Sequence, residues 1–310
     1  MCLVTGDKED LIPERTGAPK SESINSDGSS RNETSPLHKA KKVLKSGKDV
    51  GGFMLVHDHK NQKSKVFDFR ETAPGASTQK MFTDRDEALV GGLAVAVPGE
   101  VKGMEEAHKQ YGKLAWNTVV KPAADLARNG FMITKAWLGQ KVKRPDLAKT
   151  LDIIAAEGAK AFYDGTLTDS IINAIQSANP KGILTRKDLK DYKVVVRDVV
   201  KTTYNGHTVI SAPVPASGPV VLSILNILEG YKFSPKDVNK TSTYHKILEA
   251  FKFAYAQQQQ LGDPADPAYK ASVTEKMLKQ ISSIQENVHY QTCLQQYCTI
   301  QSIHVHSESL

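Results

Sequence analysis

The sequence predicts a mixed fold of the α+β class, in which helices accompany antiparallel hairpins. Two segments indicate hairpins: the first runs from Gly51 to Arg70, and the second turns at Asn205-Gly206, a dipeptide that favours tight turns between strands. Four longer segments carry apolar residues at helical spacing, namely 100–111, 116–129, 145–157 and 244–257. The two patterns together indicate a globular core built from both kinds of element.

The composition is that of an ordinary globular protein. The 310 residues are 40% hydrophobic and 24% charged, with a formal net charge of +7. Lys and Arg are interleaved with Asp and Glu and form no basic stripe with aromatic residues, so we expect no nucleic-acid partner. The longest apolar run, 219–228, is about half of the ~20 residues that span a bilayer. Since the first residues also lack an apolar signal-peptide core, we expect neither a membrane anchor nor a secretion signal.

Composition also divides the chain into three regions. Residues 1–48 are rich in Ser, Lys, Asn and Gly, and we expect them to be disordered because they cannot bury enough apolar surface to offset the entropy of ordering. Residues 49–283 carry the periodic patterns. Beyond residue 283 no Lys or Arg occurs and the periodicity fades, so we interpret 284–310 as a divergent tail. Asn32 and Asn239 begin Asn-x-Thr triplets, which are candidate glycosylation sites only in a secreted protein.

The cysteines and histidines match no compact metal motif. With Cys2 at one end and two cysteines at the other, the odd count is a poor disulfide framework and leaves the compartment open. The tail holds residues that could be combined into a zinc set, namely His289, Cys293, Cys298, His304 and His306. Their spacing differs from that of structural zinc sites, whose ligands pair at about two to five residues. We therefore expect no metal and no cofactor.

In the first hairpin, strands are expected at 51–56 and 66–70. Side chains alternate along a strand, so Phe67 and Phe69 share one face while Asp68 and Arg70 share the other.

Helices follow wherever apolar residues recur every three or four positions. Before them, the small apolar run Gly91–Val97 predicts a buried strand or a closely packed segment. His108 lies on the apolar stripe of the first helix, which favours a core or boundary histidine over a catalyst, and Gly130 is a natural helix stop. The predicted helices are 100–111, 116–129, 135–143, 145–157, 159–163, 166–177, 186–192, 220–230 and 244–257.

Local signals punctuate the second half. Thr185 and Asp188 resemble a capping box, with Asp in place of the usual Glu or Gln. Asn205-Gly206 joins predicted strands at 194–204 and 207–211. Ser217-Gly218 stands before an apolar helix, an arrangement that can bind an oxyanion or phosphate, but without the rest of a P-loop we favour a simple loop-to-helix turn.

The last predicted helix is expected to start at a Thr243 cap. Its apolar stripe predicts the buried face, made of Ile247, Leu248, Phe251, Ala254 and Tyr255.

Arg70 is the candidate binding residue. At the end of a strand whose aromatic face enters a core, its guanidinium projects from a rigid support, and a planar five-donor fork suits a carboxylate bound by two parallel hydrogen bonds. The alternative is a surface Arg in an ordinary, weak ion pair with Asp68 or Glu71, and chemistry alone favours that alternative.

The chain nevertheless contains many recognisable segments that follow one another in a fixed order. Among them are VFDFRETAPG, GGLAVAVPGEVKG, KPAADLARNGF, GILTRKDLKDYKVVVRD, ISAPVPASGP and LGDP. Together, over about 51–266, they resemble the large chain of γ-glutamyltransferases, also called glutathione hydrolases. The resemblance implies the four-layer αββα fold of N-terminal-nucleophile hydrolases, present here in part.

The resemblance also implies a function. Arg70, in the segment Arg70–Pro74, would bind the α-carboxylate of a γ-glutamyl group. Glutathione or another γ-glutamyl compound would be cleaved and its glutamyl group passed to water, an amino acid or a peptide. The acyl-enzyme would form on the N-terminal Thr of a small chain from the same precursor, at the extracellular face of the plasma membrane.

This sequence departs from the family in four places, one of which is Gln257–Gln260, where the family is normally charged. The small chain with its Thr has no counterpart here, residues 1–48 replace the family's first segment, and the connection between Leu138 and Pro145 is shorter. We therefore expect the chain alone to be inactive. The alternative function is that of an inactive truncated product, a binding or decoy partner of intact subunits.

Overall fold

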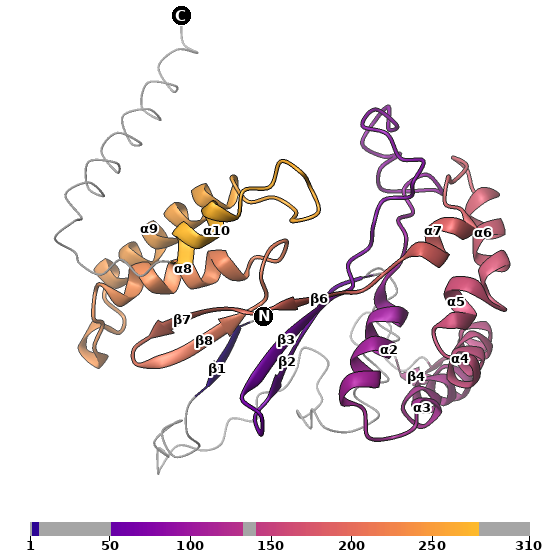
Figure 1. The fold of residues 1–310 in the computed structure, drawn as a ribbon, viewed down its shortest axis with the longest axis horizontal. Helices are drawn as coiled ribbons and strands as arrows, with labels where there is room; N and C mark the ends of the chain where they lie inside the picture. Colours follow the sequence, from indigo (N-terminus) through magenta and orange to yellow (C-terminus); the bar gives the residue numbers. More distant parts are fainter. Residues whose placement is uncertain (1, 6–50, 133–140, 279–310) are drawn as a thin grey trace, which may run out of the picture. The chain divides into compact units, whose positions relative to one another are not determined.

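The computed structural model of the chain describes residues 2–5, 51–132 and 141–278, which fall into two compact units (Figure 1). Unit 1 holds the described parts of Met1–Pro13, His57–Ser64 and Asp198–Leu310, and unit 2 those of Glu14–Val56 and Lys65–Arg197. Three predictions lie outside the described residues: disorder over 6–48, helix over 135–140, and the divergent tail with its zinc set. Asn32 lies outside them too.

A sheet with strand order β2-β3-β6 belongs mostly to unit 2. β2 (Phe53–Asp58) and β3 (Lys63–Asp68) form the predicted hairpin, and β6 (Val195–Asp198) borders β3 on its other side. Both strands extend closer to the turn than expected. Beyond β3, Gly52 and Phe69 exchange two backbone hydrogen bonds of 3.3 and 2.9 Å, so the ladder continues to residue 69.

Helix α2 (Glu100–Tyr111) has the predicted bounds and covers the aromatic face of the hairpin. Phe67, Phe69 and Ala107 are buried together there. A Cβ on Gly103 would lie 2.1 Å from the Phe69 ring, and a Cβ on Gly99 would lie 2.1 Å from the Phe69 carbonyl oxygen. The two glycines therefore make room for Phe69 against the helix.

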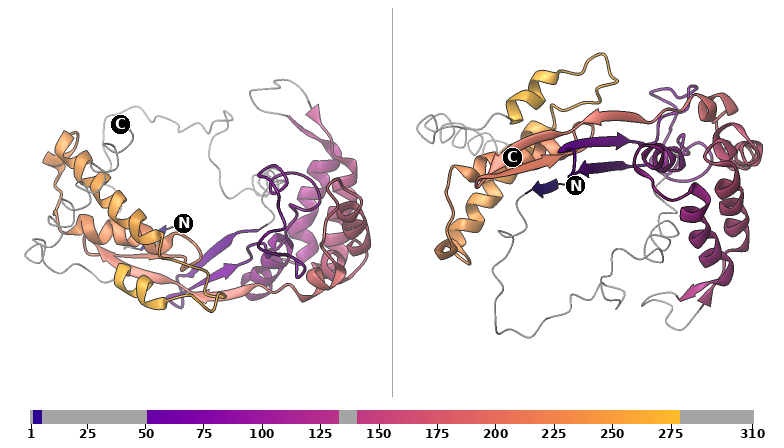
Figure 2. Two further views of the ribbon diagram at one scale, coloured as in Figure 1. Left: turned by 90° about the horizontal axis from the view of Figure 1, so that it is seen from above. Right: turned by 60° about the horizontal axis from the view of Figure 1, so that its bottom comes forward.

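The remaining helices of unit 2, drawn in magenta to rose in Figure 2, contribute to two separate clusters of buried residues. α3 (Trp116–Asn129) and α4 (Pro145–Glu157), both with the predicted bounds, pack through alanines and Leu151. α5 (Lys160–Asp164), α6 (Thr168–Gln176) and α7 (Arg186–Asp191) contribute to a second cluster, whose buried residues are Val97, Ala159, Tyr163, Leu184, Leu189 and Tyr192. The predicted capping box is present at the start of α7.

One prediction in unit 2 is wrong, and for another the structure decides between the two alternatives. β4 (Phe131–Met132) pairs with β5 (Lys141–Val142), where residues 141–142 were expected to be helical. Gly91–Val97 forms no strand and makes one bridge, between Val97 and Thr72. The alternative of close packing holds at Gly92, where a Cβ would lie 2.3 Å from the Ile175 carbonyl oxygen.

Unit 1 contains an antiparallel sheet with strand order β1-β8-β7. β7 (Val200–Tyr204) and β8 (His207–Ser211) are joined at Asn205-Gly206, whose φ angles of +48° and +77° give the predicted tight turn. The strand predicted over 194–204 is divided, since β6 joins β3 and β7 joins β8. β1 (Cys2–Thr5) pairs with β8 in a stretch where no regular structure was expected.

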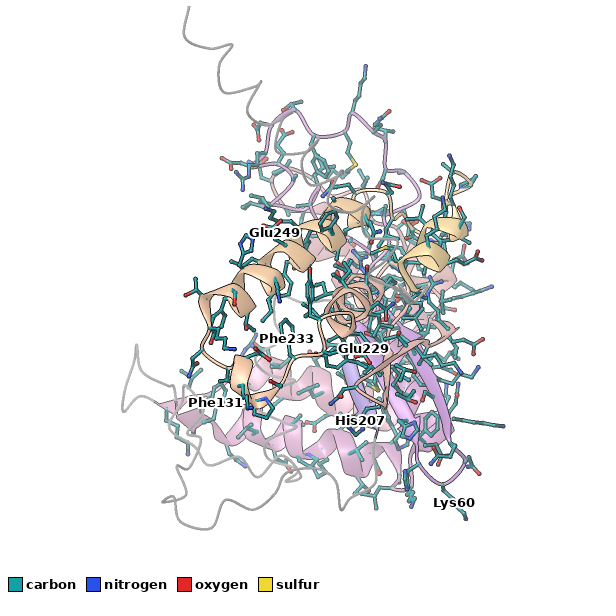
Figure 3. All side chains as sticks on the ribbon, turned by 90° about the vertical axis from the view of Figure 1, so that its left-hand side faces the viewer. Lys60, Phe131, His207, Glu229, Phe233 and Glu249 are labelled. Carbon is teal, nitrogen blue, oxygen red and sulfur yellow. The ribbon has the colours of Figure 1, made fainter. Side chains whose placement is uncertain are left out.

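Three helices and a 3₁₀ turn, η2 (Pro235–Asp237), accompany this sheet. α8 (Gly218–Glu229) packs on β7 and β8, and α9 (Thr241–Gln258) and α10 (Ala271–Leu278) pack on α8. Glu229 at the end of α8 accepts a 2.8 Å hydrogen bond from the Asn205 N–H, beside His207 at the start of β8 (Figure 3). The sequence did not predict α10.

The orientation of α9 corrects the sequence analysis. The helix starts two residues before the predicted cap, and the Thr243 hydroxyl instead donates to the Asp237 carbonyl oxygen at 2.8 Å. Small residues face α8, so Ala250 and Ala254 are buried. Three residues expected in the core are exposed, namely Leu248, Phe251 and Tyr255.

Candidate functional site

Arg70 lies directly after β3 and its side chain is exposed. The guanidinium carbon is 5.9 Å from the centroid of the Phe53 ring on β2, within the range of a cation–π contact. Within the described ranges, no carboxylate lies within ion-pair distance of this guanidinium. The fork therefore keeps its hydrogen-bond donors available for a ligand.

Asp68 explains why Arg70 is unpaired. The Asp68 side chain is 8% exposed, and both carboxylate oxygens have partners. Oδ1 accepts the backbone N–H of Arg70 at 3.2 Å, and Oδ2 accepts the Nε–H of Arg197 on β6 at 2.8 Å. The alternative proposed from the sequence, an ion pair of the Arg70 side chain with Asp68, is therefore not formed.

The backbone that carries Arg70 is attached on several sides. The hydroxyl of Tyr192 donates to the Arg70 carbonyl oxygen at 2.8 Å. Thr72 exchanges two backbone hydrogen bonds with Val97, at 3.2 and 2.8 Å. The Gly75 N–H donates to Oδ1 of Asp188 at 2.8 Å, while Oδ2 of the same carboxylate closes the capping box of α7. Residues 70–75 are thus fixed at three points, to Asp188 in α7, to Tyr192 directly after α7 and to Val97.

Behind this segment lies a buried aromatic pair. The rings of Tyr163 and Tyr192 stack with centroids 5.8 Å apart, and Nζ of Lys102 lies 5.0 Å from the Tyr163 ring centroid. Lys102 also donates to the Tyr192 carbonyl oxygen. Burial raises the pKa of both phenols well above the usual value of about 10, so the Tyr192 hydroxyl stays protonated and remains a donor. Burial also lowers the pKa of Lys102.

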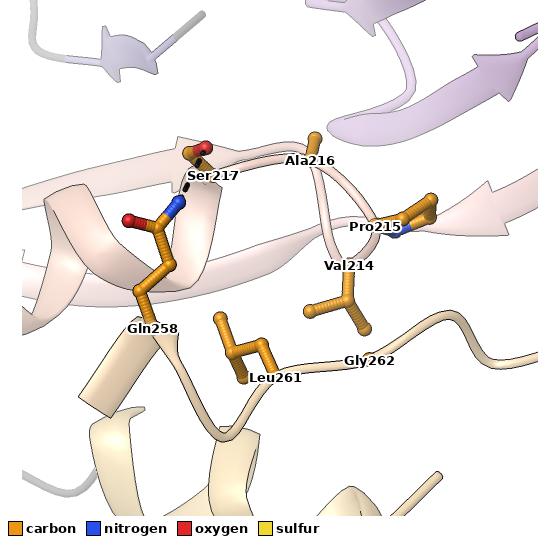
Figure 4. Close-up of a pocket in the computed structure, with 7 residues that line it drawn as sticks. All are labelled: Val214, Pro215, Ala216, Ser217, Gln258, Leu261 and Gly262. Atoms are coloured by element: carbon orange, nitrogen blue, oxygen red, sulfur yellow. Dashed lines mark hydrogen bonds between the residues drawn. The ribbon is translucent and has the colours of Figure 1, made fainter. Parts of the chain in front are cut away.

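A second candidate, in unit 1, is the turn at Ser217-Gly218. It borders a cavity of about 170 Å³ lined also by Val214, Gln258 and Leu261 (Figure 4). The Ser217 hydroxyl makes no cap bond to α8 and accepts a long 3.5 Å contact from Nε2 of Gln258. A Cβ on Gly218 would lie 1.8 Å from the Ala212 carbonyl oxygen. Close packing therefore accounts for the glycine, which supports the loop-to-helix interpretation.

The other singled-out residues have ordinary surroundings. His108 is half-buried, with Nε2 2.8 Å from the Leu114 carbonyl oxygen and its ring edge-on to Trp116. Asn239 is exposed. In the part of the chain that is described, no cluster of three or more His, Cys, Asp or Glu side chains is arranged to hold a metal ion. None of the described helices has the length and apolarity needed to cross a membrane.

Sequence reasoning proposed Arg70 but did not single out Tyr192, which contacts its backbone, or Arg197, which contacts the neighbouring Asp68. Tyr192 and Arg197 lie 122 and 129 positions away from the residues they contact. No local pattern marks either one. The only signal was that both fall inside the segment GILTRKDLKDYKVVVRD, which carried part of the family resemblance.

Comparison with known proteins identifies the class. A family model described as gamma-glutamyltranspeptidase matches residues 45–140 and 136–308, and the chain belongs to this family. The two matches meet at 136–140, near the connection that the sequence analysis found shortened, and the second continues past residue 283, where the tail was expected to diverge.

Curated relatives support the assignment. The chain is 39% identical to a glutathione hydrolase proenzyme of Arthroderma benhamiae, covering 79% of this chain and 47% of the relative. It is 36% identical to human glutathione hydrolase 7, covering 77% and 40%. The chain thus spans about half the length of the curated relatives it matches.

Solved structures confirm the predicted fold class, that of an incomplete N-terminal-nucleophile hydrolase. The gamma-glutamyltranspeptidase of Pseudomonas nitroreducens, solved with L-DON, matches with a TM-score of 0.69 at 28% identity, over 79% of this chain and 84% of the solved chain. The enzyme of Helicobacter pylori matches with a TM-score of 0.68 at 26% identity, over 86% and 95%.

Proposed function

We propose that this chain is the large-chain portion of a γ-glutamyltransferase, or glutathione hydrolase, and that Arg70 binds the α-carboxylate of the γ-glutamyl donor. The supporting observation is the guanidinium of Arg70, which is unpaired among the described residues and is carried by a backbone segment hydrogen-bonded to Tyr192, Val97 and Asp188. A fork in this state can form two parallel charge-assisted hydrogen bonds with a free carboxylate.

Binding at Arg70 serves the chemistry by position. The α-carboxylate is remote from the γ-amide that is cleaved, so gripping it orients the amide carbonyl for attack without taking part in bond making. We propose that the attacking hydroxyl belongs to an N-terminal Thr of a second chain, whose own amine is the base. Attack breaks the γ-amide bond and expels the amine part of the donor, which takes up the proton of the hydroxyl; the glutamyl ester is then transferred to water or to the amine of an amino acid or peptide, which frees the Thr.

The extents of the matches support two chains. The chain covers 95% of the solved Helicobacter pylori chain but 47% of the Arthroderma benhamiae proenzyme. This difference fits a precursor that is divided into two polypeptides, of which this chain corresponds to one. By analogy with the family we also propose action at the extracellular face of the plasma membrane.

The test is turnover of a chromogenic γ-glutamyl anilide. We expect no release of the anilide by this chain alone, and activity when a separately produced small chain of the family is added. Turnover by the chain alone would refute the two-chain proposal. A stable complex without activity would favour the alternative of an inactive binding partner.

The role of Arg70 is tested in the active complex. Arg70→Ala is expected to raise KM by about tenfold to hundredfold, since a charge-assisted hydrogen bond contributes about 1.5–3 kcal/mol. Arg85→Ala is the matched control, because Arg85 is also exposed and lies in unit 2. An unchanged KM in the Arg70 variant would eliminate its role in binding.

A further inference from the structure

We propose that Arg197 is a positioning residue, which neutralises Asp68 and thereby keeps the guanidinium of Arg70 unpaired for its ligand. The inference rests on the proposed function for the identity of that ligand. The structural part of the inference concerns the carboxylate of Asp68 and the two arginines beside it, Arg70 and Arg197.

Two arginine side chains, those of Arg70 and Arg197, lie where each can pair with the carboxylate of Asp68. Asp68 and Arg70 are two positions apart on an extended backbone, so their side chains leave the same face of the strand. The Arg70 N–H already contacts Oδ1 of Asp68, and the long Arg70 side chain can reach the same carboxylate. Arg197 occupies Oδ2 from the neighbouring strand β6 at 2.8 Å.

The difference in burial between the two arginines explains why Arg197, and not Arg70, pairs with the carboxylate of Asp68. The side chains of Asp68 and Arg197 are 8% and 18% exposed, whereas Arg70 is exposed and rests over Phe53. A buried carboxylate without a cation is strongly unfavourable, so Asp68 requires a partner. If Arg197 is replaced by an uncharged residue, we expect the Arg70 guanidinium to form an ion pair with Asp68. Arg70 would then no longer be free to bind the substrate.

The first experiment measures the free guanidinium on this chain, without a second chain or substrate. Phenylglyoxal modifies accessible, unpaired arginines, and mass spectrometry reports the rate at Arg70, with the exposed Arg85 as internal reference. We expect Arg197→Gln to slow the modification of Arg70 at least about threefold relative to Arg85. In this variant Arg70 pairs with Asp68 in most molecules, so the fraction of molecules with a free, reactive Arg70 guanidinium falls. Arg197→Lys retains the charge and is expected to keep the wild-type rate.

The decisive variant is Asp68→Asn combined with Arg197→Gln. An Asn amide has no charge with which to capture Arg70, so the double variant is expected to restore the Arg70 modification rate. An unchanged rate in Arg197→Gln would overturn the proposal. A double variant that stays as slow as the single one would also overturn it, since the loss would then come from local distortion.

The second experiment uses the active complex of the two chains. Arg197→Gln is expected to raise KM for the γ-glutamyl anilide with little change in kcat, and the added Asp68→Asn to lower KM again. If Arg70→Ala raises KM while Arg197→Gln does not, the positioning role fails and the proposed function stands. If Arg70→Ala leaves KM unchanged while the modification pattern holds, the proposed function fails instead.

Discussion

At the scale of single residues, the candidate site depends on contacts that converge on Arg70 from distant parts of unit 2. Asp68 accepts the backbone N–H of Arg70, the Tyr192 hydroxyl donates to its carbonyl oxygen, and its guanidinium lies over the Phe53 ring. The sequence could nominate Arg70 as a candidate because the strand and its alternation are local, and the family resemblance then favoured it over an ordinary surface Arg. The sequence could not identify Tyr192 or Arg197, because their contacts form only when segments more than a hundred positions apart are brought together by folding.

Tyr192→Phe tests the hydroxyl that holds the Arg70 carbonyl. Removing it should destabilise the chain by about 1 kcal/mol, and in the active complex it should also raise KM. Tyr163→Phe is the matched control, because the Tyr163 hydroxyl donates to the Pro98 carbonyl oxygen at 2.8 Å instead. The control should lose similar stability in urea unfolding but leave KM unchanged. Equal effects on KM would show that Tyr192 acts only through stability.

The same two phenols predict a dependence of stability on pH. Burial raises the pKa of Tyr163 and Tyr192 in the folded chain above the unfolded value of about 10. Their contribution is therefore fully present below pH of about 10 and is lost as the pH rises further, since only the unfolded chain readily ionises. Urea unfolding between about pH 9 and 11 should show this fall, and it should be smaller when both residues are Phe. An identical fall in that double variant would contradict the assignment.

At the scale of elements, the sequence predicted best where local signals are complete. α2, α3 and α4 have the expected bounds because apolar stripes, a Pro start or a Gly stop mark them, and the Asn205-Gly206 turn follows from the φ angles that these two residues tolerate. The division of 194–204 between two sheets was not predictable, because partner choice by a strand depends on distant segments. α9 was misjudged because its small residues, rather than its large ones, face α8.

Gly103→Ala tests the fit of α2 against the hairpin. The added methyl would lie 2.1 Å from the Phe69 ring, so we expect destabilisation of about 2–3 kcal/mol in urea unfolding. Gly206→Ala is the comparison variant. Nothing lies within 4 Å of its added Cβ, so its cost of about 1–2 kcal/mol comes from the φ of +77° alone. If Gly103→Ala is as stable as wild type, Phe69 does not pack as described.

At the scale of the whole molecule, the chain has the extent of one solved chain of its family and about half that of the curated proenzymes. Unit 1 displays a row of large apolar side chains along α9, made of Tyr244, Leu248, Phe251 and Tyr255. These positions follow helical spacing and lie on one side of the helix. Exposed apolar rows of this kind promote self-association in an isolated chain.

Leu248→Gln with Phe251→Gln should therefore reduce self-association of the isolated chain, measured by light scattering. The free energy of unfolding should change by less than about 0.5 kcal/mol for each exposed substitution. Ala254→Leu is the matched buried variant on the same helix and should cost about 1–3 kcal/mol, because Ala254 is fully buried against α8. A large loss of stability in the Gln variants would show that this face is packed.

The Asp188 carboxylate closes the capping box of α7 and also binds the loop that contains Gly75. Its Oδ2 accepts the hydrogen bonds of the cap and its Oδ1 accepts the Gly75 N–H, so one carboxylate couples the start of α7 to the loop that follows Arg70, the residue proposed to bind the donor carboxylate. A Glu, the commoner residue in such a cap, could preserve the helix end while displacing the second oxygen from the Gly75 amide. An apparently conservative exchange far along the chain would then loosen the grip on a donor molecule while the helix itself stayed intact.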